Sequence, residues 1–223
     1  MSDMRALYNI IGYVPGDEEL FVTAVTHSSC GLKYNNEKLE FLGDAVLELI
    51  SSEFLFSSFT DMNEGELSKL RSEIVCENAL YEWALSVGFG RFLRLGKGEE
   101  LTGGRSKPSI LSDAVEAVIA AIYLDGGYES AKSFALTVLT YLIKLKDRGM
   151  LFTDAKTALQ EILQKDGGAL PVYEVVKTEG PPHARIFVVS VSFGGGIAAS
   201  GTGSSKKQAE QNAARSAILK LRN

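Results

Sequence analysis

The chain has 223 residues, of which 45% are hydrophobic and 23% are charged. A chain of this size and composition forms a globular protein with one or two cores, which excludes a disordered tail, a collagen-like fibre and a disulfide-stabilised miniprotein. The net charge of −5 conceals a division, because residues 1–150 carry −8 and residues 151–223 carry +3. We therefore expect two parts with different roles.

The first part is predicted to be all-α. Apolar residues recur there at helical spacing, which predicts helices near residues 4–12, 18–30, 37–59, 64–87, 109–124 and 128–146. Residues 88–109 contain glycines at 88, 90, 96, 98, 103 and 104, too many for a helix, so we expect an ordered loop or short 3₁₀ turns there.

In the second part the apolar residues do not keep helical spacing throughout. Asp154 is a candidate N-cap for a helix, so we place a linker at residues 148–153 between domains at 1–147 and 154–223. Three β-type runs separated by glycine-rich and proline-rich turns predict a meander, at residues 172–178, 185–193 and 196–202. The last segment returns to helical spacing. The predicted order is α-β-β-β-α, an α+β domain.

Targeting signals are not found in the sequence. No apolar run reaches the roughly 20 residues of a membrane span, and the start lacks the basic region and cleavage site of a secretory signal. We therefore expect a cytoplasmic protein with no membrane partner. Cys30 and Cys76 have no metal-binding spacing and are expected to be thiols.

The segment NNEKLEFLGDAVLELI carries a stripe of acids. At about 100° per residue, four carboxylates fall within an arc of about 80°, opposite a set of apolar residues that includes Leu49. The acids are Glu37, Glu40, Asp44 and Glu48. Like charges at this spacing destabilise a helix, so a bound divalent cation is one explanation. The alternative is an amphipathic helix that keeps its acids in water.

A second pair of acids interrupts an apolar helix. Residues 110–124 are apolar on nearly every side, which is typical of a helix buried all round, yet Asp113 and Glu116 lie one turn apart within them. Buried carboxylates are costly unless they are paired or bind a metal. The alternative is that an arginine or a helix N-terminus satisfies them.

Two such helices face to face would form an all-oxygen cluster. This is the ligand set that Mg²⁺ and Mn²⁺ prefer. The two histidines, His27 and His183, make no zinc motif, and His27 is expected to be structural. Among the kinds of metal-dependent catalysis, phosphoryl transfer assisted by a hard divalent cation is the one that these residues still allow. The glycines form neither a P-loop nor a dinucleotide fingerprint, so no nucleotide cofactor is expected.

The last helix begins with two lysines, Lys206 and Lys207, although positive charges at a helix N-terminus oppose the helix dipole. Together with backbone N–H groups they would clamp a phosphate. The alternative is a solvated lysine pair without a role.

Phe41 lies on the same side of its helix as the stripe of acids. It either packs in the core or enters a partner subunit.

Three segments together resemble the bacterial ribonuclease III family, over essentially the whole chain. NNEKLEFLGDAVL is similar to the family signature, SILSDAVEAVIAAIYLDGG is similar to its second acidic helix, and residues 154–222 resemble a double-stranded RNA-binding domain. The resemblance implies an all-α endonuclease domain followed by an α+β (α-β-β-β-α) double-stranded RNA-binding domain. It implies a homodimer that hydrolyses double-stranded RNA by Mg²⁺-dependent in-line attack of water. Products would be 5′-phosphate and 3′-hydroxyl ends with short 3′ overhangs, from ribosomal and other structured RNA precursors.

The resemblance also implies residue roles. The metal ligands would be Glu40, Asp44, Asp113 and Glu116, of which Asp44 and Glu116 are the catalytic pair, and Mn²⁺ would substitute for Mg²⁺. Glu37 and Glu64 match acids of the same valley, and Phe41 matches a residue that docks into the other subunit. RNA contacts are implied for Thr157, Gln160, Glu161, Gln164, His183, Lys206 and Lys207, and near the acidic helix for Arg105 and Lys107.

Two other functions compete with this interpretation. One is a double-stranded RNA chaperone or ribosome-assembly factor without catalysis, which loss of Asp44 or Glu116 would have favoured. The other is a helical metal-dependent phosphohydrolase acting on nucleotides, which the scarcity of histidine disfavours. Cleavage of duplex RNA but not of free nucleotides separates them.

Overall fold

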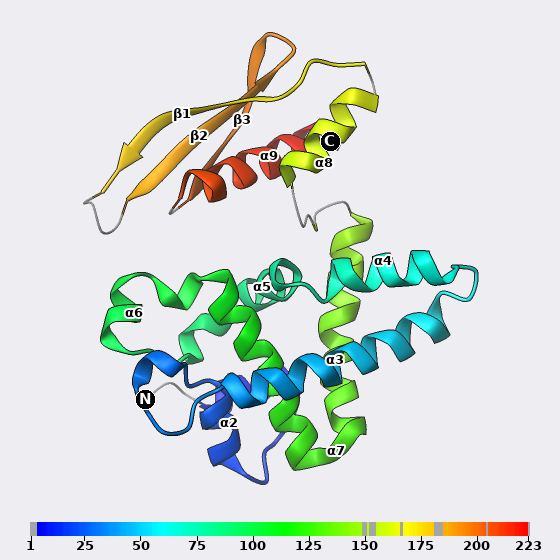
Figure 1. Ribbon diagram of the computed structural model, residues 1–223, viewed down its shortest axis with the longest axis vertical. Helices are drawn as coiled ribbons and strands as arrows, with labels where there is room; N and C mark the ends of the chain where they lie inside the picture. Colours follow the sequence, from blue (N-terminus) through cyan, green and yellow to red (C-terminus); the bar gives the residue numbers. More distant parts are fainter. Residues whose placement is uncertain are drawn as a thin grey trace. The chain divides into compact units, whose positions relative to one another are not determined.

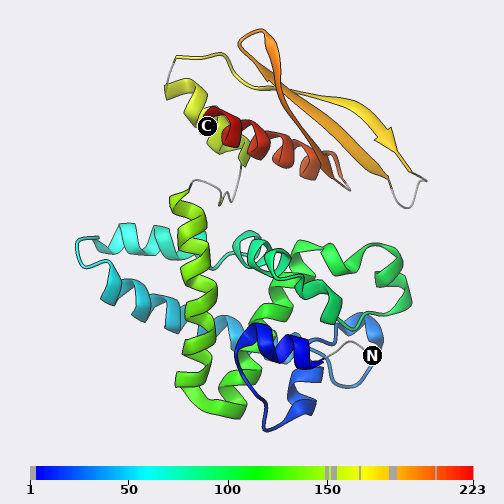
Figure 2. The same cartoon turned by 180° about the vertical axis from the view of Figure 1, so that it is seen from behind.

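The structure is a computed structural model that describes residues 4–148, 151, 155–165, 167–180, 185–203 and 205–222 (Figure 1 and Figure 2). The chain forms two compact units, Met1–Leu145 and Lys146–Asn223. Most of the expected linker, and Asp154, lie outside the described residues, so the domain boundaries stay predictions. No described helix is both long and apolar enough to span a membrane.

The first unit is helical, as predicted. Its helices are α1 (Met4–Ile11), α2 (Glu18–Ala24), α3 (Glu37–Ser58), α4 (Glu64–Ile74), α5 (Glu77–Ser86), α6 (Lys97–Leu101) and α7 (Pro108–Asp147). Three 3₁₀ turns separate some of them: η1 (Ser28–Cys30), η2 (Phe89–Phe92) and η3 (Gly104–Ser106). The loop predicted at 88–109 contains two 3₁₀ turns, as expected, and also one short helix, α6, which the prediction did not include.

Two predicted helices are divided in the structure. The helix expected at 64–87 is α4 and α5, with Cys76 in an extended conformation at the N-cap of α5. The helix expected at 18–30 is α2 followed by η1. Helical spacing could not reveal the first break, because the apolar stripe continues through it without glycine or proline.

α7 consists of two arms that meet at Gly127. This glycine has φ 77° and ψ −178°, a conformation that side chains disfavour, so the kink requires glycine. The arms match the helices predicted at 109–124 and 128–146. In the first arm Leu111, Val115 and Ile119 are fully buried, which places this arm in the core of the unit.

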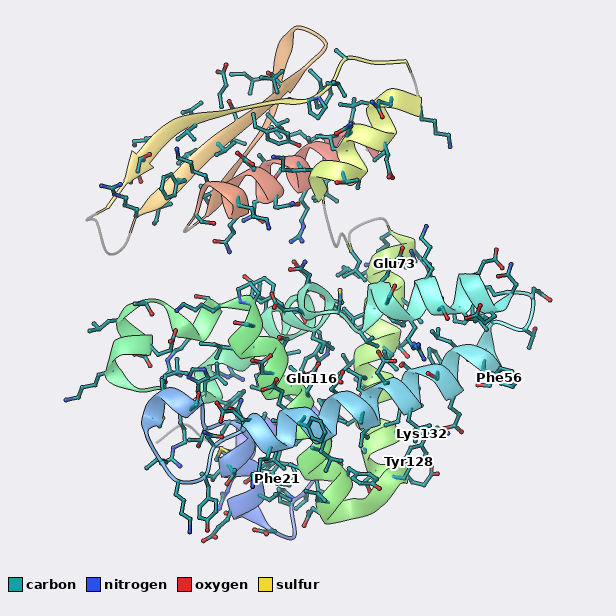
Figure 3. The ribbon with its side chains drawn as sticks, in the orientation of Figure 1. Phe21, Phe56, Glu73, Glu116, Tyr128 and Lys132 are labelled. Atoms are coloured by element: carbon teal, nitrogen blue, oxygen red, sulfur yellow. The ribbon has the colours of Figure 1, made fainter. Side chains whose placement is uncertain are left out.

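The second arm of α7 is tied to α3. The Tyr128 hydroxyl donates to Glu53, and Lys132 Nζ lies 2.7 Å from the same carboxylate. Figure 3 shows Tyr128 and Lys132 beside α3. The pair of bonds fixes α3 against the second arm of α7.

The second unit has the predicted α-β-β-β-α order: α8 (Ala155–Lys165), β1 (Val172–Glu179), β2 (Ile186–Phe193), β3 (Gly196–Gly203) and α9 (Lys206–Arg222). The strands form an antiparallel sheet in the order β1-β2-β3. In both views of the ribbon, α8 and α9 lie on the same face of the sheet (Figure 1 and Figure 2). Their core contains the fully buried Leu159, Val189, Val191, Ala213 and Ile218.

Candidate functional site

The site begins where α3 crosses the first arm of α7. A β-carbon placed on Gly43 would lie 1.9 Å from the carbonyl oxygen of Glu116, so the two backbones touch. Only glycine permits this approach. The crossing brings Glu40, one turn before Gly43, and Asp44, the next residue, close to the acids of α7.

Three carboxylates converge at this crossing. One carboxylate oxygen from each of Glu40, Asp113 and Glu116 lies within 4.8 Å of the others, and all three residues are half-buried. Figure 3 shows Glu116 on α7, directed toward α3. The cluster joins residues more than 70 positions apart in the sequence.

The pKa values show how unfavourable the ionised cluster is. Burial, together with the charges of Asp44, Asp113 and Glu40, raises the pKa of Glu116 to about 8. Burial and neighbouring acids also raise the pKa of Glu40. Burial is the main cause of the raised pKa of Asp113, and the charge of Glu77 on α5 adds to it. Glu77 was not identified from the sequence, since only the fold brings α5 near α7.

The other predicted acids occupy different surroundings. Asp44 is exposed, and its charge raises the pKa values of Glu40 and Glu116, so it lies at the edge of the cluster. Glu37 accepts a hydrogen bond from the Asn35 amide at 3.1 Å and also contributes its charge to the raised pKa of Glu40. Glu64 accepts from Ser68 Oγ at 2.9 Å, within α4.

Glu48, the last acid of the stripe, has a structural partner. Its carboxylate lies 3.0 Å from Arg71 Nε of α4, and Arg71 also donates to Ser52 Oγ at 2.7 Å. Glu48 therefore ties α3 to α4.

The donor set fits a hard divalent cation. Carboxylate oxygens are the ligands that Mg²⁺ and Mn²⁺ prefer, and a cation would offset both the burial and the mutual repulsion that raise these pKa values. The residues placed to hold it are Glu40, Asp113 and Glu116, with Asp44 beside them.

A stripe of exposed apolar side chains runs along α3. Phe41, Leu49 and Phe56 are 81%, 59% and 78% exposed, and Ala45 lies between the first two. The sequence groups Leu49 with the apolar residues opposite the acids, and in the structure its side chain is exposed rather than buried with them. Figure 3 shows Phe56 near the end of α3.

Arg105 and Lys107 are engaged within the helical unit. Arg105 donates to both carboxylate oxygens of Glu100, at 2.6 and 2.7 Å, and to the carbonyl oxygens of Gly90 and Leu93. Lys107 Nζ lies 2.5 Å from Glu99 Oε1. These contacts give both side chains a role in holding the 88–107 segment, which the sequence did not reveal.

His27 also has a structural role, as expected. Its Nδ1 accepts from the backbone N–H of Ser29 at 3.2 Å and caps η1. The thiols of Cys30 and Cys76 are free.

In the second unit, the predicted RNA-binding residues share one surface of α8. The side chains opposite its buried face are exposed, and they are Thr157, Gln160, Glu161 and Gln164. Lys206 and Lys207 are exposed in the first turn of α9, where Ser205 Oγ accepts from Gln208 N at 3.2 Å. His183 lies outside the described residues.

Comparison with known proteins matches both units. A family model described as ribonuclease-III-like matches residues 17–142, and one described as double-stranded RNA binding motif matches residues 155–221. The protein named ribonuclease 3 from Clostridium botulinum (strain Eklund 17B / Type B) is 50% identical over 217 residues, covering 96% of this chain and 94% of that protein.

Solved structures agree with these matches. The crystal structure of the nuclease domain of ribonuclease III from Campylobacter jejuni is 45% identical, with a TM-score of 0.61, over 63% of this chain and 96% of that one. A second structure of that domain, with the same identity and TM-score, covers 62% of this chain and 97% of that one, and is described as showing flexibility in the region involved in dimer formation. The chain therefore belongs to the ribonuclease III family of metal-dependent endoribonucleases that act on double-stranded RNA.

Proposed function

We propose that this chain hydrolyses phosphodiester bonds of double-stranded RNA with Mg²⁺ at the crossing of α3 and α7. The observation that carries the proposal is the convergence of Glu40, Asp113 and Glu116 within 4.8 Å. Water attacks in line, and the products carry 5′-phosphate and 3′-hydroxyl ends with short 3′ overhangs. Ribosomal and other structured RNA precursors are the proposed substrates, and Mn²⁺ substitutes for Mg²⁺.

The acidic residues have two proposed roles. Glu40, Asp44, Asp113 and Glu116 hold the cations, and Glu37 and Glu64 line the same valley. The bound cations would supply Lewis-acid chemistry, which activates an attacking water and stabilises a leaving 3′ oxygen. Because the pKa of Glu116 is about 8, its carboxyl group must release a proton before it can serve as a ligand near neutral pH. Asp44 and Glu116 are the proposed catalytic pair.

A homodimer supplies one cleavage site for each strand. The exposed stripe of Phe41, Leu49 and Phe56 on α3 is the apolar surface suited to a second copy, and a dimer region is described for the nuclease domain from C. jejuni. Phe41, beside the acidic ridge, is the proposed docking residue.

The second unit binds the duplex by shape. Thr157, Gln160, Glu161 and Gln164 face one minor groove, and His183 reaches a second minor groove. Lys206 and Lys207 span the phosphates between the two grooves. Recognition of this kind spans about 16 base pairs and reads 2′-hydroxyl groups more than sequence. Arg105 and Lys107 contribute mainly by holding their own segment in place.

The experiment is a cleavage assay on a uniform RNA duplex of a few tens of base pairs, in Mg²⁺, in Ca²⁺ and in EDTA, with analysis of the product ends. Mg²⁺-dependent cuts with short 3′ overhangs are expected. Binding without cleavage in every metal would instead assign the chain to the non-catalytic RNA-binding proteins. Hydrolysis of free nucleotides would contradict the proposed substrate.

A further inference from the structure

The RNA-binding surface of the second unit has two pieces, on α8 and on α9, and α9 is fixed to the sheet. A β-carbon on Gly201 would lie 2.2 Å from the backbone nitrogen of Ala213, so β3 and α9 are in direct contact. The Asn212 amide donates to the carbonyl oxygen of Thr202 at 2.8 Å. The N-terminus of α9, with its two lysines, therefore has a defined position on β3.

The first turn of α8 is bonded to α9 through Gln211. Its Oε1 accepts hydrogen bonds from the backbone N–H groups of Ala155 at 2.7 Å and Lys156 at 3.3 Å. The first N–H groups of a helix have no partner within the helix, and a nearby residue of the same segment usually caps them. At Ala155 and Lys156 an acceptor comes from a helix about 55 residues further along the chain.

Lys156 makes a second connection between the same elements. Its Nζ lies 2.6 Å from Glu210 Oε2 on α9 and 4.6 Å from the centre of the Tyr173 ring on β1. An ion pair of this exposure contributes little by itself. Together with the Gln211 bonds, it fixes the rotation of the first turn of α8 relative to α9.

We propose that Gln211 is a positioning residue for duplex RNA binding. By capping α8 from α9, it holds Thr157 and the rest of the exposed face at a fixed distance from Lys206 and Lys207. The grooves and phosphates of A-form RNA have a fixed spacing, so both pieces bind together only if their separation matches it. This inference rests on the RNA-binding surface proposed above.

Two substitutions at Gln211 test whether its side-chain oxygen matters as a hydrogen-bond acceptor. Gln211→Met keeps the length of the side chain but removes the oxygen, whereas Gln211→Glu keeps an acceptor that a helix N-terminus favours. Binding of the full chain to an RNA duplex is measured in EDTA over a series of salt concentrations. We expect Gln211→Met to weaken binding by roughly threefold to tenfold at every salt concentration, and Gln211→Glu to restore it.

The salt dependence of RNA binding distinguishes the role of Gln211 from that of the two lysines. Because Lys206 and Lys207 are intact in both variants, the slope of log affinity against log salt should not change. Hydrogen exchange at the Ala155 and Lys156 amides should accelerate in Gln211→Met only. Glu210→Gln, which weakens the Lys156 ion pair and leaves the cap, should reduce binding by less than about threefold.

The outcomes are distinct. Failure of the unmodified chain to bind duplex RNA would overturn the proposed function and this inference together. Equal binding by the unmodified chain and folded Gln211→Met would overturn the inference alone. If Gln211→Met unfolds and Gln211→Glu folds without recovering affinity, Gln211 serves stability only, and the inference is again overturned.

Discussion

Gly43 of α3 and Glu116 of α7 are in backbone contact: a β-carbon at Gly43 would lie 1.9 Å from the Glu116 carbonyl oxygen and 2.4 Å from its carbonyl carbon. The distance between the two acidic helices is therefore set by a missing side chain. Any larger residue must separate the helices and, with them, Glu40 from Glu116.

The first prediction follows from this contact. Gly43→Ala should destabilise the helical unit by about 1–3 kcal/mol through overpacking. It should also reduce duplex cleavage by more than about 100-fold, because a displacement near 1 Å misplaces the metal ligands. Thermal unfolding and single-turnover cleavage measure the two effects. Gly98→Ala is the matched control, since no atom lies within 4 Å of its added β-carbon; full activity of Gly43→Ala would disprove the dependence on close approach.

The second prediction concerns the carboxylate at the centre of the cluster. Glu116→Gln should retain duplex binding and lose cleavage by more than about 100-fold, because it removes a metal ligand without touching the second unit. Gel-shift and cleavage assays in millimolar Mg²⁺ test this. Glu48→Gln is the control from the same stripe, because Glu48 pairs with Arg71, and it should remain active. Normal cleavage by Glu116→Gln would show that the site is wrongly assigned.

The third prediction concerns pH in the absence of divalent cations. Since the folded-state pKa of Glu116 is raised to about 8, the folded chain holds this proton between about pH 5 and 8 while the unfolded chain does not. Stability should therefore decrease as the pH rises through this range, and addition of Mg²⁺ should oppose the decrease. In EDTA, Glu116→Gln should melt a few degrees higher than the unmodified chain at pH 8 and about equally at pH 4. A pH dependence identical in both proteins would count against the raised pKa.

The fourth prediction concerns the basic end of α9. Replacing Lys206 and Lys207 with alanine should weaken duplex binding and reduce the salt slope by up to about two units. Titrations at several salt concentrations measure this. Lys177→Ala serves as the control, because Lys177 pairs with Glu179 on β1. An unchanged slope in the double variant would exclude the phosphate clamp.

The fifth prediction concerns the apolar stripe of α3. Phe41→Ala combined with Phe56→Ala should weaken self-association by tenfold or more, because exposed aromatic side chains dominate interfaces of this kind. Sedimentation velocity over a concentration series measures the change. Leu101→Ala removes a side chain that is 80% exposed on α6, away from the stripe, and should leave association unchanged. Equal association of all three proteins would place the dimer surface elsewhere.

The sequence by itself predicted the fold class of both units and the chemistry of the site. Helical spacing located α3 and both arms of α7, and β-type runs located the three strands to within about one residue. These features are local, since they depend on the alternation of apolar and polar residues within one segment. Spacing and the apolar surroundings of Asp113 and Glu116 supplied the candidate acids, and the resemblance to the ribonuclease III family implied which of them bind metal.

Tertiary structure decided which of those residues act together. It paired Glu48 with Arg71, left Leu49 exposed, and brought Glu77 near Asp113. None of these relationships can be predicted from the sequence of one segment, because each depends on the angle and distance at which two helices pack. The same holds for the Gln211 cap on α8 and for Gly43, whose missing side chain matters only because α7 lies against it.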